Sequence, residues 1–402
     1  MATGSTSQMS PGQEAGRPQP QTTVEASGGP FIRHSQPGRA PIYNVTGTAF
    51  GGIVTQPLVA RPGYFRNFRV TQSVTGGTGV GVTYTNIDAP FNLNSLVQVR
   101  DAFGTPLVVA GGYEVSNLIQ IFSGAFGLNN GTNVQANLPS NINLPSSGNF
   151  QISYSLPLEF AKAYGVLSAA NASLLPQIIF NLNAVATVMA GSAGSPVVNT
   201  SVDTDFYWLP EGVAVEPPGL GTTRQWILQQ ANPGVGSGGS ARIQFPRLGG
   251  YLDTVIVEAR DSTGARIATA WPTGTTGSGR IQFYLDGVPV IDSTLNEMFD
   301  SMAIEFGLTP AQIGWASGAT VAGTAANANL TGVMAFTRKN SLNQQNLGLL
   351  DTGEAYLSTN PGTLLEMNIN TAGTISNTPA TFSVLVGQIV PTGAIIQGLP
   401  EV

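Results

Sequence analysis

The sequence predicts an all-β protein of two tandem jelly rolls, each an eight-stranded antiparallel sandwich with short helices and long loops. Three observations lead to this fold class: the composition, a series of short β-rich runs, and an internal duplication. Only 9% of the 402 residues are charged, whereas 50 are Gly and 27 are Pro. Residues that favour strands and turns therefore dominate, and a helical bundle is excluded.

The composition also narrows the chemistry. The chain has no Cys, a single His (His34) and two Lys (Lys162 and Lys339). Thiolate nucleophiles, Cys-ligated metals and multi-His metal sites are thereby excluded. The net charge of −6 and the lack of a basic cluster argue against specific nucleic-acid binding. We expect no enzymatic activity, no catalytic residue, no cofactor and no metal site.

The first 42 residues are expected to form a flexible N-terminal arm, because they are rich in Gln, Pro, Gly, Ser and Thr. They carry no recognisable targeting signal. After them the chain consists of short β-rich runs separated by Gly, Asn and Pro. The runs predicted as strands are 65–70, 95–99, 149–156, 177–183, 205–209, 252–257, 280–285, 333–337, 364–369 and 381–390.

The duplication emerges when the chain is compared with itself at an offset of about 184 residues. Residues 96–99 then fall on 280–283, and each run is followed by a turn and an apolar stripe at helical spacing. The stripe residues are Val115, Leu118 and Phe122 in the first copy and Phe299, Met302 and Phe306 in the second. Thr294 and Glu297 form a capping-box pattern at the start of the second helix.

Long segments without β pattern also recur at matching positions. They are 124–148 with 307–331, and roughly 157–175 with 339–360. We therefore predict one jelly roll over residues 43–219 and a second over 220–402. The segment 215–219, Val-Glu-Pro-Pro-Gly, is the expected linker, because two prolines and a glycine interrupt a strand ladder.

On these features the sequence resembles the double jelly-roll major capsid proteins of tectiviruses and their relatives in the adenovirus-type lineage. The resemblance is carried by residues 148–158, where an apolar strand runs into Leu-Pro-Leu, by the apolar strand over 174–182, and by 91–101, where an Asn-Leu-Val strand enters a turn. It covers most of 60–210 and extends more loosely over the second half. The loops of this chain depart from the family in carrying almost no charge.

The resemblance implies a coat protein that assembles as homotrimeric, pseudo-hexagonal capsomers into an icosahedral shell, in a bacteriophage with an internal membrane. The implied partners are further copies of the chain, vertex or minor capsid proteins, and membrane lipid reached through the N-terminal arm. The implied location is the virion, with host cytoplasm during assembly. Two other functions stay open: a virion spike or receptor-binding protein, and a secreted carbohydrate-active β-sandwich enzyme.

Two sets of acidic residues are candidate sites. Asp203 and Asp205 could begin a calcium site, but no full ligand set follows, so a pair at a strand start is favoured. Asp253, Glu258 and Asp261 could supply a glycosidase-like carboxylate pair, but solvated charges at a sheet edge are favoured.

The remaining motifs are weaker. The Gly-rich run 76–81 lacks the Lys and helix of a phosphate-binding loop and is predicted to link two strands. Matches to the glycosylation pattern, among them Asn44, Asn130 and Asn171, are expected from composition alone. A mild basic bias near the N-terminus could face lipid or nucleic acid, but salt bridges at a subunit contact are favoured. Its residues are Arg33, Arg39, Arg61, Arg66 and Arg69.

Overall fold

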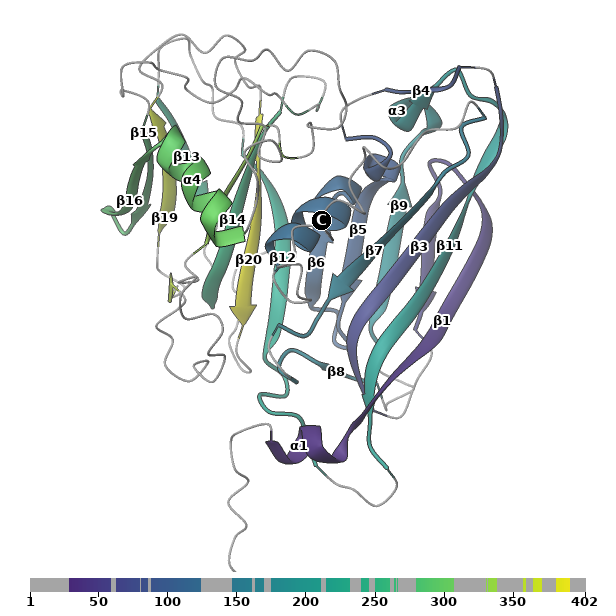
Figure 1. Ribbon diagram of the computed structural model, residues 1–402, viewed down its shortest axis with the longest axis horizontal. Coiled ribbons are helices and arrows are strands. Elements are labelled where there is room, and N and C mark those ends of the chain that lie inside the picture. Colours follow the sequence, from purple (N-terminus) through teal and green to yellow (C-terminus); the bar gives the residue numbers. More distant parts are fainter. Residues whose placement is uncertain are drawn as a thin grey trace, which may run out of the picture.

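Strands dominate the structure, a computed structural model in which helices are few and short (Figure 1). The N-terminal half stands on the right of this view and the C-terminal half on the left, with the strands of both running roughly upright. The described residues are 29–58, 63–79, 81–85, 88–123, 147–160, 163–169, 175–210, 215–231, 240–245, 250–260, 264, 266, 280–306, 330, 332–337, 357–358, 364–370 and 381–390.

The first jelly roll has two four-stranded antiparallel layers, in the orders β1-β11-β3-β7 and β2-β9-β5-β6. The bounds are β1 Gln36–Ala49, β2 Ile53–Pro57, β3 Tyr64–Thr78, β5 Asn94–Arg100, β6 Pro106–Ala110, β7 Gln151–Pro157, β9 Gln177–Leu182 and β11 Ala193–Trp208. Small elements complete the roll: α1 Gly29–His34, β4 Thr83–Tyr84, η1 Phe91–Leu93, β8 Leu167–Ser168, α3 Val185–Val188 and β10 Met189–Ala190.

The second jelly roll repeats this arrangement, with layers β12-β20-β14-β17 and β13-β19-β15-β16. The bounds are β12 Thr223–Ala231, β13 Ser240–Phe245, β14 Tyr251–Arg260, β15 Arg280–Leu285, β16 Val288–Thr294, β17 Val333–Thr337, β18 Leu357–Ser358, β19 Leu365–Asn370 and β20 Thr381–Val390. Both layers match the first roll strand for strand, and β18 pairs with β14 as β8 pairs with β3. The predicted fold class is confirmed.

The two rolls share one sheet. Strand β6 of the first roll pairs in parallel with β12 of the second, with Val108 opposite Trp226 and Val109 opposite Ile227. This pairing joins a layer of each roll into a nine-stranded sheet. The relative position of the rolls is therefore fixed by backbone pairing as well as by side-chain packing.

Alternation along the strands explains the core of the first roll. In β3, Phe68, Val70 and Val74 are buried, whereas Arg69 between them is exposed. Gln72 continues the buried side, where its Nε2 donates to Asn94 Oδ1 over 3.1 Å and its Oε1 accepts from Asn94 Nδ2 over 2.7 Å. A buried polar pair satisfied in both directions links the two layers.

A helix covers each roll at the same point of the topology. In the first roll a π-helical turn, η2 (Glu114–Leu118), leads into α2 (Ile119–Phe122) between β6 and β7. In the second, α4 (Leu295–Phe306) lies between β16 and β17. Val115, Leu118, Phe122, Phe299 and Met302 are buried as the stripes predict. The predicted capping box is present, since Glu297 N donates to Thr294 Oγ1 over 3.3 Å and Thr294 N to Glu297 Oε2 over 2.7 Å.

Regular structure occurs earlier in the chain than the sequence indicated, because residues up to 42 were expected to form a flexible arm. Strand β1 begins at Gln36 and pairs with β11, so part of the expected arm belongs to the first sheet. Before it, Phe31 of α1 is buried, with its ring centroid 5.6 Å from that of Tyr64 and 5.4 Å from that of Tyr207. An aromatic anchor therefore holds α1 against the first roll.

The prediction also missed strands β1, β2, β6, β12, β13 and β16 and the two-residue strands β4, β8, β10 and β18. In contrast, β20 has the predicted bounds. The long segments 124–146 and 307–329 lie outside the described residues, as do most of 339–360. Within the described part of the chain, no helix combines the length and apolar character needed to cross a bilayer. The domain bounds 43–219 and 220–402 stay a prediction.

Candidate assembly interface

A cluster of charged side chains lies buried between the two rolls. Its centre is Arg260, the last residue of β14. Arg260 Nη1 donates to Asp88 Oδ2 over 2.7 Å, and Nη2 donates to Glu114 Oε1 over 2.8 Å. Nη2 also donates to Glu258 Oε2 on the same strand. Since Asp88 and Glu114 belong to the first roll, Arg260 ties the two rolls together.

A second arginine completes this cluster. Arg266 is buried and its Nε donates to Asp88 Oδ1. Its guanidinium group lies over the ring of Tyr113, 3.9 Å from the centroid. A cation–π contact is strongest where water is excluded, as it is here.

The cluster contains three carboxyl groups but only two guanidinium groups. The pKa values of two of these carboxyl groups are therefore shifted in opposite directions. Burial would raise the pKa of Asp88, but Arg266 and Arg260 together hold it below its ordinary value. Burial raises the pKa of Glu258 to about 8, against the attraction of Arg260 and with the help of Glu114 and Asp88. Its Oε1 has no hydrogen-bond partner among the described residues. Glu258 is therefore the group that retains a proton at neutral pH.

Replacing Glu258 with Gln should remove a pH-dependent loss of stability. Folding raises the pKa of this carboxyl to about 8. The unfolded chain ionises it from about 4.3, so stability falls as pH rises between these two values. From about pH 5 to about pH 8, wild type should lose on the order of a few kcal/mol more than Glu258→Gln. Denaturant titrations at three pH values measure this. The exposed Glu216→Gln is the control and should keep the wild-type profile, whereas parallel profiles for wild type and Glu258→Gln would contradict the assignment.

A second charged contact joins the rolls through Arg224 of β12. Its Nη1 donates over 2.8 Å to the backbone oxygen of Ser123, the residue that caps the C-terminus of α2, and its Nη2 donates to the buried Asp253. Its guanidinium group also lies 4.7 Å from the ring centroid of Trp226. A cation at a helix C-terminus is favourable, so this contact attaches the second roll to the helix of the first.

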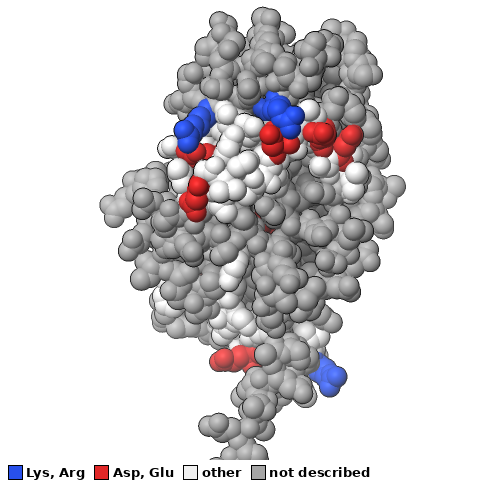
Figure 2. Space-filling view, turned by 90° about the vertical axis from the view of Figure 1, so that its left-hand side faces the viewer, with Lys and Arg blue, Asp and Glu red and all other residues white. Residues whose placement is uncertain are grey.

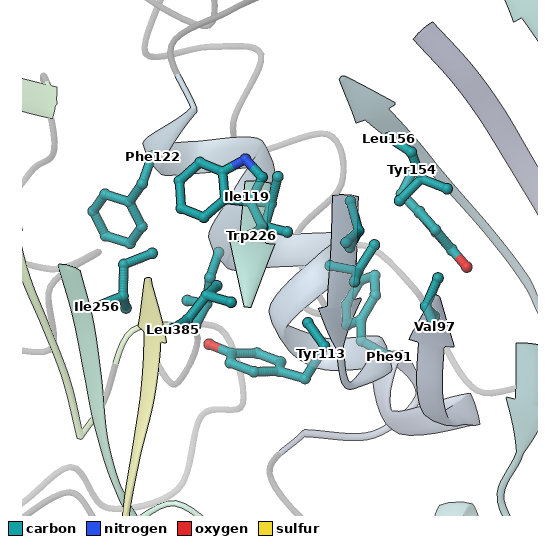
Figure 3. Close-up of a cluster of buried hydrophobic side chains, with 14 of the residues drawn as sticks. Phe91, Val97, Tyr113, Ile119, Phe122, Tyr154, Leu156, Trp226, Ile256 and Leu385 are labelled. Carbon is teal, nitrogen blue, oxygen red and sulfur yellow. The ribbon is translucent and has the colours of Figure 1, made fainter. Parts of the chain in front are cut away.

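Apolar side chains fill the space between the charged contacts. Figure 3 shows Ile119 and Phe122 on the helix of the first roll beside Trp226, with Ile256 and Leu385 on strands of the second. All five are buried and belong to one continuous apolar cluster. The junction thus has a packed apolar centre with paired charges, which is the anatomy of a stable protein interface.

The structure corrects one interpretation of the sequence. Asp253 and Glu258, predicted as solvated charges at a sheet edge, are buried and paired with Arg224 and Arg260. Strand β14 is covered on both faces, because the first roll packs on its outer side. Asp261, the third residue of that candidate set, lies outside the described residues.

Both carboxylate oxygens of Asp205 accept hydrogen bonds from arginine side chains. Its Oδ1 accepts from Arg39 Nε over 2.8 Å and its Oδ2 from Arg69 Nε over 2.7 Å. Burial would raise the pKa of Asp205, but the bonds from Arg39, Arg69 and Asn67 keep it below its ordinary value. The neighbouring Asp203 is half-buried on the same strand. Among the described residues, His, Asp and Glu do not gather in any group that could hold a metal ion.

The other residues singled out from the sequence lie apart. Arg66 bonds Glu159 over 2.6 Å and lies over the Tyr207 ring, while Arg33 and His34 are exposed at the end of α1. The run 76–81 was predicted as a loop, but its first three residues belong to β3, which extends to Thr78. Asn44 is exposed on β1. Those that lie outside the described residues are Arg61, Asn130, Lys162, Asn171 and Lys339.

Figure 2 shows the outer side of the second roll, where several acidic and basic side chains border uncharged described residues. Two large apolar side chains among the described residues of this roll are more than half exposed. Ile304 of α4 is 74% exposed and Val288 of β16 is 62% exposed. Near them, Arg280 pairs with Asp292 over 2.5 Å, and Arg242 pairs with Glu366. Both arginines are thus paired, whereas Glu297 and Asp300 of α4 are exposed carboxylates. Exposed apolar side chains such as Ile304 suit contact with protein.

Comparison with known proteins identifies similar folds but no related sequence. No protein-family model matches the chain, and no curated protein matches it. Among solved structures it is similar to the STIV MCP, with a TM-score of 0.58 and 12% identity over 90% of this chain and 100% of that one. It is also similar to PBCV-1 VP54, fitted into a reconstruction of the virophage Sputnik, with a TM-score of 0.56 and 12% identity over 88% and 93% of the two chains. The PBCV-1 virus capsid gives a TM-score of 0.55 and 12% identity over 92% and 97%. The likeness spans both rolls.

Proposed function

We propose that this chain is the major capsid protein of an icosahedral virus and that it assembles as a homotrimeric, pseudo-hexagonal capsomer. Its role is structural and not enzymatic. The observation that carries the proposal is the presence of two equivalent rolls joined through a packed junction. Three such chains present six equivalent units, which suits a six-sided building block. The similarity to the STIV MCP and to the PBCV-1 capsid supports the same role.

The surface chemistry supports self-association. Most of the charged side chains among the described residues form ion pairs within the chain, whereas Ile304 and Val288 are exposed. Low unpaired charge limits repulsion between crowded copies. Large obligate interfaces are also the apolar ones. We place the protein in the virion, with host cytoplasm as the place of assembly, and we propose a bacteriophage with an internal membrane as its source.

Further partners follow from this role. Vertex or minor capsid proteins would contact the shell, and the N-terminal segment would reach a neighbouring subunit or membrane lipid. The segment that can extend away from the first roll ends before Phe31, because that side chain is buried. We propose the bounds 43–219 and 220–402 for the rolls, with β1 added to the first from Gln36.

Electron microscopy of the concentrated, purified chain tests the function. We expect hexagonal arrays or closed shells, since a coat protein carries lateral contacts on every side. A spike or receptor-binding protein would give separate particles without lateral order, and that outcome would overturn the proposal. The carbohydrate-active alternative predicts glycan hydrolysis by the same preparation, and we expect none.

A further inference from the structure

The charges in the junction between the rolls balance only while one carboxyl group is neutral. The first roll contributes Asp88 and Glu114, and the second roll contributes Arg260 and Arg266. These two acids and two arginines cancel each other in charge. Glu258 adds a third carboxyl group from the second roll, and its side chain is completely buried. An ionised Glu258 would therefore leave an unbalanced negative charge inside the protein, which is strongly unfavourable.

The hydrogen bonds also identify Glu258 as the carboxyl group that holds a proton. Both oxygens of Asp88 accept from arginine, Oδ2 from Arg260 and Oδ1 from Arg266. Glu258 accepts through Oε2 alone, because its Oε1 has no hydrogen-bond partner among the described residues. A buried carboxylate with an unbonded oxygen keeps the full penalty for leaving water, and the neutral form avoids most of it. Burial accordingly raises the pKa of Glu258 to about 8.

Glu258 and Glu114 share one donor atom of Arg260. Arg260 Nη2 donates to Glu114 Oε1 over 2.8 Å across the junction, and it also donates to Glu258 Oε2 on its own strand. While Glu258 is neutral, the positive charge of Arg260 acts mainly on the acids of the first roll. An ionised Glu258 would attract this guanidinium group toward the second roll and repel Asp88 and Glu114. Ionisation therefore weakens the contact between the rolls.

The other titratable and charged groups around Glu258 do not offset this effect. Burial raises the pKa of Tyr113, so its hydroxyl group stays neutral. Asp253, near the other end of β14, pairs with Arg224. Opposite Glu258, β20 contributes Ser383, and β17 carries no charged residue. Among the described residues of the junction, Glu258 is thus the group whose ionisation changes the charge near neutral pH.

The backbone joins the rolls over a much shorter stretch than it joins strands within a roll. Among the described strands, the pairing across the junction consists of Val108 with Trp226 and Val109 with Ile227. By contrast, β12 pairs with β20 along its whole length, Thr223–Ala231. Few backbone hydrogen bonds therefore have to break for the rolls to part locally while each sheet keeps its other pairings.

We propose that Glu258 is a pH-sensitive switch between the two rolls: when protonated it leaves Arg260 to the acids of the first roll, and when ionised it loosens the junction while each roll stays folded. The switch acts within one chain and goes beyond the structural role proposed above. In an open junction Glu258 meets water and returns to a pKa of about 4.3. The open junction thus binds fewer protons than the closed one, so local opening becomes more frequent as pH rises, by up to about tenfold for each pH unit between about 5 and 8.

Hydrogen exchange of the full chain, followed by mass spectrometry between about pH 5 and about pH 8, tests this switch. The readout is the ratio of exchange rates in wild type and Glu258→Gln, because the intrinsic rise of exchange with pH cancels in that ratio. For peptides from β6 and β12 the ratio should rise with pH by up to about tenfold per unit. For peptides from β3 and β11, which pair inside the first roll, the ratio should stay constant.

A second variant changes the charge balance from the other roll. Glu114→Gln removes one carboxylate but keeps an oxygen that can accept from Arg260. Two carboxyl groups then face two arginines, so Glu258 can ionise inside the closed junction. The pH dependence at β6 and β12 should therefore weaken in this variant too, which also serves if Glu258→Gln does not fold. The matched control is Glu366→Gln, which changes a buried glutamate paired with Arg242 on β19 and should leave that dependence unchanged.

Two results would overturn the switch. The first is a ratio that rises equally at β6, β12, β3 and β11, because ionisation of Glu258 would then loosen the whole fold and not the junction. The second is a pH dependence at β6 and β12 that persists undiminished in Glu258→Gln or in Glu114→Gln, because the charge balance of this cluster would then not control opening. Either result would leave the proposed function standing, since assembly is measured separately.

Discussion

Replacing Arg260 with Ala should be among the most destabilising single changes in the chain. Arg260 contacts Asp88, Glu114 and Glu258, and its side chain is only 11% exposed. Its loss leaves buried carboxylates without their shared cation, a situation that costs about 3–5 kcal/mol. Urea denaturation of the full chain would measure this as a lower midpoint, and the first signal to change should report on the junction between the rolls.

The matched control is Arg280→Ala. Arg280 also pairs with an aspartate, Asp292, but both side chains are more than 40% exposed. Such surface pairs contribute about 0–1 kcal/mol. If Arg260→Ala were no more destabilising than Arg280→Ala, the buried cluster would not hold the rolls together.

Trp226→Ala should lower the free energy of unfolding by a similar amount to Arg260→Ala, but for a different reason. Trp226 is fully buried in the junction and pairs with Val108 across it. Its ring lies directly on β20, where a side chain at Gly387 would come within 2.7 Å of it. Removing a large aromatic side chain from such a packed site costs about 3–5 kcal/mol, since the cavity cannot collapse fully.

Trp208→Ala is the matched control for Trp226→Ala, because it makes the same chemical change at a partly exposed position. Trp208 ends β11 and is 36% exposed, so its removal should cost about 1 kcal/mol. Thermal unfolding of both variants, followed by tryptophan fluorescence and circular dichroism, checks the ranking. Equal losses for the two would contradict the central place of Trp226 in the junction.

The fold class could be predicted because the two copies of the duplication share short sequence patterns in the same order. The run 381–390 is mostly apolar and became β20 with unchanged bounds, and the Thr294 and Glu297 capping box begins α4. Strand β1 could not be predicted in the same way. It contains Pro37 and Pro41, which argue against a strand in local terms, and it forms because β11 offers a partner for an edge strand.

The junction was hidden from the sequence because its partners are far apart. Arg260 and Glu114 are 146 residues apart, and Arg266 and Asp88 are 178 apart. No local pattern reports such a pair. One signal was available: in a chain with only 9% charged residues, the close spacing of Asp253, Glu258, Arg260 and Arg266 is unusual within an apolar strand region. Where such charges are buried, they are almost always paired.

The central claim is that two equivalent rolls, joined by a packed junction, form a unit that associates with itself in threes. Native mass spectrometry of the purified full chain tests it most directly. The account predicts one dominant species at three times the 41.6 kDa of a single chain, persisting on dilution into the micromolar range. A spectrum that contains only the single chain at high protein concentration, or only dimers, would contradict it.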